Sequence, residues 1–185
     1  MSRPMRTYYY AVAGAIGGLI AWRLSDLVGL SFTVNLYLNE IIVGGLIGLS
    51  IGLLIGATEG IVTLSPRRAA RSALIAAPIG LLAGALALPL SEAAFQAMGG
   101  EAVGRVLGWA LFGLLIGLAE GASGRTQSWK GALGGALGGA LGGALLVASQ
   151  QRLDNPMLGK AMGLVVLGAC VGAFIALISV LLSRA

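Results

Sequence analysis

Two glutamates lie in two apolar stretches of nearly identical sequence, and they are the residues best placed to bind an ion. Glu59 lies in GLLIGATEG (52–60) and Glu120 lies in GLLIGLAEG (113–121). A carboxylate in such surroundings is costly to bury, and for that reason it often marks a path for ions or protons. Basic residues follow each of them: Arg67, Arg68 and Arg71 after the first, and Arg125 and Lys130 after the second. We therefore expect interfacial ion pairs between neighbouring helices, with ion coordination as the alternative.

Two further basic residues occupy corresponding places later in the chain. Arg105 and Lys160 both lie close to the start of a glycine-containing apolar run. Their long side chains can reach the polar edge of a membrane while the stems remain in apolar surroundings. Besides this structural role, they are candidates for holding an anionic lipid or a carboxylate of a partner protein. Arg23 and Asp26 are spaced to pair across one helical turn.

The residues of most catalytic and metal sites are missing. The chain has no histidine and one cysteine, Cys170, which lies in an apolar run. An intramolecular disulfide, a Cys/His metal cluster and a histidine-dependent nucleophile are therefore excluded. The string GALGGALGGALGG lacks the preceding strand, the Lys-Ser/Thr pair and the acid of a nucleotide-binding loop. We predict no catalytic residue, no metal and no cofactor, with bound lipid as the one candidate ligand.

The overall composition places the chain in a membrane. Of its 185 residues, 57% are hydrophobic and only 10% are charged, whereas soluble domains carry about 25% charged residues. The net charge of +5 is spread over the segments between apolar runs, a pattern that orients membrane helices. The composition therefore predicts membrane lipids as partners and gives no reason to expect nucleic acid.

Six apolar segments are long enough to cross the bilayer, for which about 20 helical residues suffice. They lie near residues 8–30, 37–62, 72–92, 102–122, 130–149 and 158–182. With both termini in the cytoplasm, eight of the twelve basic residues face that side, as the positive-inside rule requires. We therefore predict an all-α, multi-pass membrane protein that is N-in and C-in.

Glycines recur at every fourth residue along two of these segments. One row is Gly44, Gly48, Gly52, Gly56 and Gly60, and the other is Gly131, Gly135, Gly139 and Gly143. Residues four apart share one helix face, and small residues there let helix backbones touch in a membrane. We expect both rows to make helix contacts, within this chain or with a helix of another protein.

The chain also repeats internally. The two GLLIG stretches lie 61 residues apart, and Gly108, Gly113 and Gly117 recur 55 residues later as Gly163, Gly168 and Gly172. This period divides a single membrane domain, residues 1–185, into three helical hairpins at about 8–64, 65–125 and 126–185. Because every hairpin starts and ends on the same side, the repeats are parallel. We predict a pseudo-threefold bundle of six helices.

The stretches GWALFGLLIGLAEG (108–121) and SWKGALGGALGGALGG (128–143) resemble a glycine-rich membrane region of bacterial proteins. In those proteins the region is often linked with forkhead-associated or von Willebrand A domains. The resemblance implies a module of the bacterial cytoplasmic (inner) membrane that works with other proteins, and it carries over no catalytic residues.

Two functions are compatible with these features. The first is a non-enzymatic integral membrane subunit or scaffold, which packs with partner membrane proteins or with copies of itself through its glycine-rich helix faces. The alternative is a small channel or carrier with a path along the pseudo-threefold axis. The segment 131–149 contains no ionisable residue, and transport proteins commonly need such groups at mid-membrane. This favours the subunit over the channel.

Overall fold

The structure is a computed structural model that describes residues 3–29, 36–99, 102–122, 128–152 and 155–181, and every regular element within them is a helix. The helices are α1 (Arg3–Gly29), α2 (Leu36–Val62), α3 (Pro66–Ala97), α4 (Ala102–Ala122), α5 (Ser128–Arg152) and α6 (Pro156–Leu181). They confirm the predicted all-α fold of six helices. Five are long and apolar enough to cross a membrane. The apolar part of α4, Ala102–Leu118, is shorter, so the sixth span stays a prediction.

Helix α3 departs most from its predicted bounds. The sequence predicts a span over 72–92, whereas the helix runs from Pro66 to Ala97. Proline is well tolerated in a first turn, where its missing N–H would have no partner, so Pro66 begins the helix instead of preceding it. At about 1.5 Å per residue, its 32 residues span about 48 Å, more than the roughly 30 Å of hydrocarbon. Polar residues occur near both of its ends, Arg67 and Arg68 at the start and Glu92 and Gln96 at the finish.

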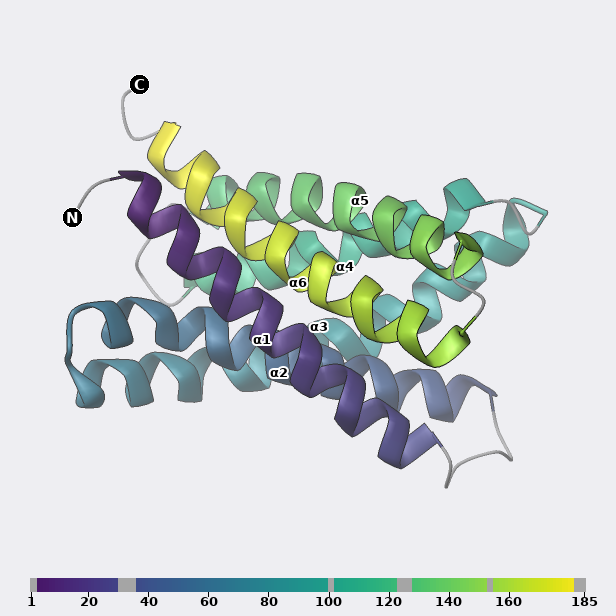
Figure 1. Cartoon of the computed structure of the whole chain (residues 1–185), viewed down its shortest axis with the longest axis horizontal. Helices are drawn as coiled ribbons and strands as arrows, with labels where there is room; N and C mark the ends of the chain where they lie inside the picture. The colour runs from purple at the N-terminus through teal and green to yellow at the C-terminus, as the bar shows by residue number, and fades with distance from the viewer. Residues whose placement is uncertain (1–2, 30–35, 100–101, 123–127, 153–154, 182–185) are drawn as a thin grey trace.

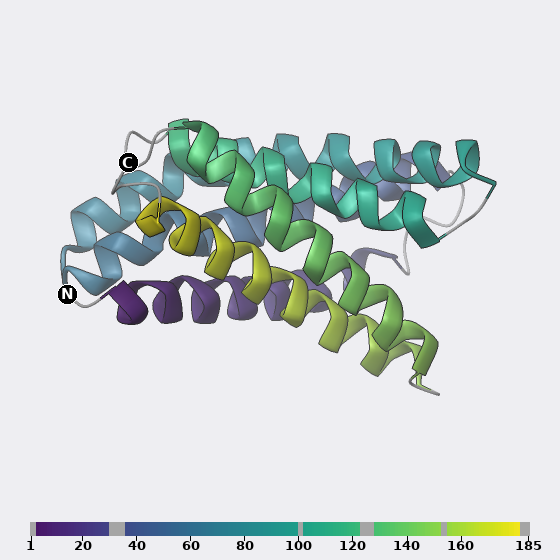
Figure 2. The ribbon, with the colours of Figure 1, turned by 90° about the horizontal axis from the view of Figure 1, so that it is seen from above.

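The six helices form a closed ring in chain order. Each packs against the helices before and after it, and α1 packs against α6. The start of α1 (purple) and the end of α6 (yellow) lie at one end of the molecule, together with the turn between α2 and α3 (Figure 1). The view from above shows the same grouping (Figure 2). This arrangement agrees with an even number of membrane crossings.

The core is formed mainly by side chains from α2, α4 and α6. Ile51 and Ile55, Phe112 and Ile116, and Leu167 and Val171 are each at most 1% exposed. The outside carries many exposed leucines, among them Leu82 and Leu86 of α3. A soluble protein rarely exposes so continuous an apolar surface, whereas lipid tails solvate it well. The distribution of side chains is therefore that of a membrane bundle.

A tight turn connects α2 to α3 and positions the first glycine row. The N–H of Ser65 donates to the carbonyl of Gly60 (2.9 Å), and the N–H of Leu64 donates to that of Ile61 (3.1 Å). These are the two hydrogen bonds of a Schellman motif. Leu64 occupies the left-handed position of this motif, with a φ of 51°. Glycine is the usual residue at that position. The turn returns α3 alongside α2, so the two helices are antiparallel neighbours.

Candidate functional site

The first glycine row lies against α3 along its whole length. A Cβ atom at Gly44 would overlap the carbonyl group of Gly84, and one at Gly48 would overlap that of Gly80. A Cβ atom at Gly60 would overlap the backbone of Ala69, one at Gly56 would overlap Cβ of Ala76, and one at Gly52 would lie 3.0 Å from the carbonyl oxygen of Ala76. Residues without a side chain permit such backbone contact. The row is thus occupied within the chain, and a partner helix has no access to it in this arrangement.

Helix α5 has glycine on two faces, because its sequence repeats the tetrapeptide GALG three times. The predicted row, Gly131, Gly135, Gly139 and Gly143, lies against Gly117, Gly113 and Trp109 of α4. A second row, Gly134, Gly138 and Gly142, lies against Phe174, Cys170 and Leu167 of α6. The sequence analysis did not predict this second row, although its glycines also recur at every fourth residue and so share one helix face. Both glycine faces of α5 are used inside the bundle.

The centre of the ring is filled by bulky side chains. Ile51, Phe112 and Leu167 are 0%, 1% and 0% exposed and belong to one apolar cluster. Ile55 of α2 and Ile116 of α4 belong to the same cluster. Protein interiors pack as densely as organic crystals and leave few voids larger than a water molecule. In the described part of the chain, the centre is therefore closed and apolar.

The polar side chains that are buried in the described part of the chain are all small hydroxyls. Ser50 donates to the carbonyl of Leu46 (2.8 Å), and Thr58 donates to that of Leu54 (2.8 Å). Ser179 makes the equivalent bond to Ile175 (2.6 Å). Each of these three hydroxyls donates its hydrogen within its own helix, so none of the three links one helix to another.

The predicted charge cluster at the α2–α3 turn is described in the structure. Glu59 is half-buried near the end of α2, and Arg67 and Arg68 are exposed in the first turn of α3. These residues lie at the same end of the bundle, on the two sides of one turn. The hydroxyl of Thr63 donates to the backbone carbonyl of Glu59 (2.8 Å) and helps to close that turn. An ion pair between Glu59 and these arginines stays a prediction.

The corresponding cluster after α4 lies largely outside the described residues. Glu120 is in the last turn of α4, but its side chain is not among those described, and the whole of Arg125 lies outside them. Lys130 is described, and its Nζ lies 5.6 Å from the centroid of the Trp129 ring. This is a cation–π contact at the start of α5. The predicted pairing with Glu120 therefore stays a prediction.

Arg105 belongs to a group of charged side chains at the opposite end of the bundle. Its guanidinium lies 4.4 Å from the centroid of the Phe95 ring, close enough for a cation–π contact. Glu40 of α2 is within electrostatic reach of this arginine and of Glu92 of α3. Gln96 donates to Glu92 (3.1 Å). Three helices thus bring opposite charges together here, a grouping that was not predicted although both acids fall on the predicted outer side.

A cavity of about 270 Å³ opens beside Arg105. Phe95, Gln150 and Gln151 also line it, so a guanidinium and two amides can donate hydrogen bonds to an acceptor there. Lys160, which the sequence pairs with Arg105 as a lipid or partner contact, is half-buried on α6 and does not line this cavity. The two basic residues are therefore separate features.

The remaining predicted ion pair is present on α1. Arg23 Nη1 lies 3.6 Å from Asp26 Oδ2, as the spacing of three residues predicts. In the described ranges, no three His, Cys, Asp or Glu side chains are grouped closely enough to hold a metal ion. The polar contacts described above are therefore an ion pair, cation–π contacts, an amide–carboxylate hydrogen bond and hydroxyl–backbone bonds.

Comparisons with protein-family models, with curated proteins and with solved structures find no match to this chain. Its class therefore rests on its own architecture. Five helices able to cross a membrane, a leucine-rich outside and glycine contacts between helices place it among the multi-pass helical membrane proteins. The resemblance to a glycine-rich bacterial membrane region stays a prediction.

Proposed function

We propose that the chain is a non-enzymatic integral membrane subunit or scaffold, inserted N-in and C-in in a bacterial inner membrane. The closed centre, where Ile51, Phe112 and Leu167 are fully buried, supports this most strongly. A protein that moves ions needs polar or ionisable groups along the path, whereas the buried hydroxyls of Ser50, Thr58 and Ser179 bond within their own helices. A closed bundle is suited to holding other membrane proteins in place.

The same proposal includes a pseudo-threefold ring of three parallel hairpins, and two sets of contacts support it. Offsets of 61 and 55 residues relate Gly52, Gly113 and Gly168, and each packs on a helix of an adjoining hairpin: α3, α5 and α1 respectively. The same offsets relate Ile51, Phe112 and Leu167, which share the core cluster. A chance similarity between glycine-rich sequences would not explain why residues at these offsets pack on corresponding helices. An internal structural repeat explains it.

Partner proteins meet the leucine-rich outside under this proposal, because α3 and α4 already occupy the two predicted glycine rows. On α5 the leucine of each tetrapeptide points outwards, and Leu133, Leu137, Leu141 and Leu145 are about half exposed. Such a face can pack against the helix of another protein or a second copy as well as against lipid tails. The outer face of α5 is the surface on which we place the partner contact.

The alternative function is a small channel or carrier, and the charged residues at the two ends of the bundle favour it. Glu59 lies at one end, and Glu40, Glu92 and Arg105 lie at the other. Charged residues at the entrances of a pore select ions. A path between these ends would have to pass the layer formed by Ile51, Phe112 and Leu167, which is closed.

Flux measurements on reconstituted liposomes separate the two functions. For a closed subunit, we expect leakage of ions and small solutes to equal that of protein-free liposomes, because the centre is filled. The variants Glu59→Gln and Glu120→Gln should leave this background unchanged. Protein-dependent flux that disappears in Glu59→Gln, while thermal unfolding remains that of the wild type, would instead establish the carrier.

A further inference from the structure

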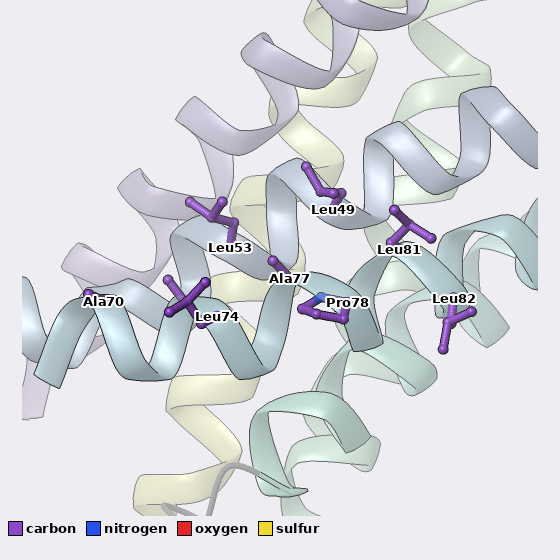
Figure 3. Close-up of a pocket in the computed structure, with 9 residues that line it drawn as sticks. Leu49, Leu53, Ala70, Leu74, Ala77, Pro78, Leu81 and Leu82 are labelled. Carbon is purple, nitrogen blue, oxygen red and sulfur yellow. The ribbon is translucent and has the colours of Figure 1, made fainter.

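A groove runs along the outside of the bundle between α2 and α3 (Figure 3). All residues that line it are apolar, and its volume is about 670 Å³. Small side chains such as Ala70, Ala73 and Ala77 alternate with longer ones such as Leu53 and Leu74. The hollow exists because the alanines do not fill the space between neighbouring leucines.

The dimensions of this groove suit an acyl chain. Along α3 it extends from Ala70 to Leu82, which is about 18 Å of helix. One leaflet of the hydrocarbon core is about 15 Å deep. The groove is thus long enough for a lipid tail.

Two arginines lie near the end of the groove that faces the α2–α3 turn: Arg67 precedes Ala70, the first α3 residue of the lining, and Arg71 directly follows it. Arg67 and Arg71 each lie three residues before a residue that lines the groove, Ala70 and Leu74, so they share its side of the helix. Both arginines are exposed. Arg68 is also exposed, but it lies about 100° further round the helix from Arg67 and off this face. Two positive charges therefore stand where an apolar chain would leave the groove.

We propose that this groove binds one anionic phospholipid, with an acyl chain along its apolar length and the phosphate at Arg67 and Arg71. Basic residues at the edge of an intramembrane groove attract anionic headgroups, and guanidinium groups match phosphate geometry. Ser65 makes no side-chain capping hydrogen bond to the start of α3, so the positive end of that helix adds to the attraction. This lipid site is independent of the subunit function proposed above.

Native mass spectrometry of the full chain in detergent, titrated with phosphatidylglycerol or with phosphatidylcholine of the same tails, tests the headgroup. We expect one phosphatidylglycerol to bind about 25-fold more tightly than phosphatidylcholine, since each of the two arginines contributes about fivefold. The double variant Arg67→Gln/Arg71→Gln should lose this preference. The control Arg68→Gln, which removes one neighbouring charge off the groove face, should keep the preference within about twofold, whereas Arg67→Gln and Arg71→Gln should each reduce it about fivefold.

A second pair of variants tests the tail. Ala73→Phe places a ring in the groove and should weaken binding of both lipids at least tenfold, whereas Ala144→Phe on the exposed outside of α5 should not. Thermal unfolding in detergent checks that each variant is folded. Equal binding of the two lipids, equal loss in Arg68→Gln and in the double variant, or a protein dimer that forms in place of the lipid complex would overturn the proposal. None of these results bears on whether the chain is a subunit.

Discussion

Gly48 and Gly45 lie about one turn apart on α2, yet they have different room for a side chain. A Cβ atom at Gly48 would overlap the carbonyl oxygen of Gly80, whereas one at Gly45 would lie 3.6 Å from the nearest atom, the carbonyl oxygen of Leu81. That second distance is an ordinary van der Waals contact. Both glycines have the same intrinsic helix propensity. The difference therefore comes from how closely the α3 backbone approaches each position.

We predict that Gly48→Ala destabilises the protein by about 1–3 kcal/mol, which is typical of forcing a methyl group into a packed site. Gly45→Ala is the matched control and should change stability by less than about 0.5 kcal/mol. Chemical or thermal unfolding in detergent micelles measures both. An equal loss in the two variants would mean that the α2–α3 contact is looser than the structure places it.

The individual residues that could be predicted are those whose role depends on local spacing. The glycine rows and the pair of Arg23 and Asp26 follow from helical periodicity alone. The stacking of Arg105 on Phe95 could not be predicted, because it depends on the approach of α3 to α4 after a turn of unknown geometry. The distance between residues on different helices is a tertiary property, and local spacing carries no information on it.

At the scale of elements, the α2–α3 turn carries an avoidable strain. Leu64 is 91% exposed and holds a φ of 51°, a left-handed conformation that costs a residue with a Cβ about 1–2 kcal/mol. The two Schellman hydrogen bonds hold it there. The turn aligns α2 with α3 over the full glycine row, and a glycine at position 64 would adopt the same backbone without the strain.

We expect Leu64→Gly to stabilise the protein by about 0.5–1 kcal/mol, because relief of the left-handed strain outweighs the added freedom of glycine in the unfolded chain. Leu64→Ala keeps the Cβ and should give no such gain. Melting temperatures of the three proteins in the same detergent provide the measurement. If alanine stabilised as much as glycine, loss of the exposed leucine side chain would be responsible, and the backbone explanation would be incorrect.

Most helices could be located from the sequence, since apolar length and loop residues determine where a membrane helix begins and ends. The exception, α3, shows the limit of that reasoning. Its first two turns carry Arg67, Arg68 and Arg71, which hydropathy assigns to a loop. Helical structure persists there because Pro66 starts the helix and packing on Gly60 continues to Ala69. Hydropathy finds the membrane-embedded part of a helix and not its polar extensions.

For the whole molecule, the order of helices around the ring and the groove between α2 and α3 lie beyond sequence reasoning. The tetrapeptide repeat of α5 shows that two of its faces are small, but it does not say that α4 takes one and α6 the other. That choice depends on how all six helices close into a ring. Once the ring is closed, the glycine faces are buried and the leucine faces remain outside, which decides the surface that a partner can reach.

The central claim is that this closed bundle works as a subunit among other membrane proteins. The most direct test is mass measurement of the protein extracted from its native membrane with the surrounding lipid retained. We predict a stoichiometric complex with at least one other membrane protein, which dissociates when Leu137 and Leu141 on the outer face of α5 are replaced by alanine. A single chain or a homo-oligomer with no other protein, joined to measurable ion flux in liposomes, would contradict this account and indicate a channel or carrier.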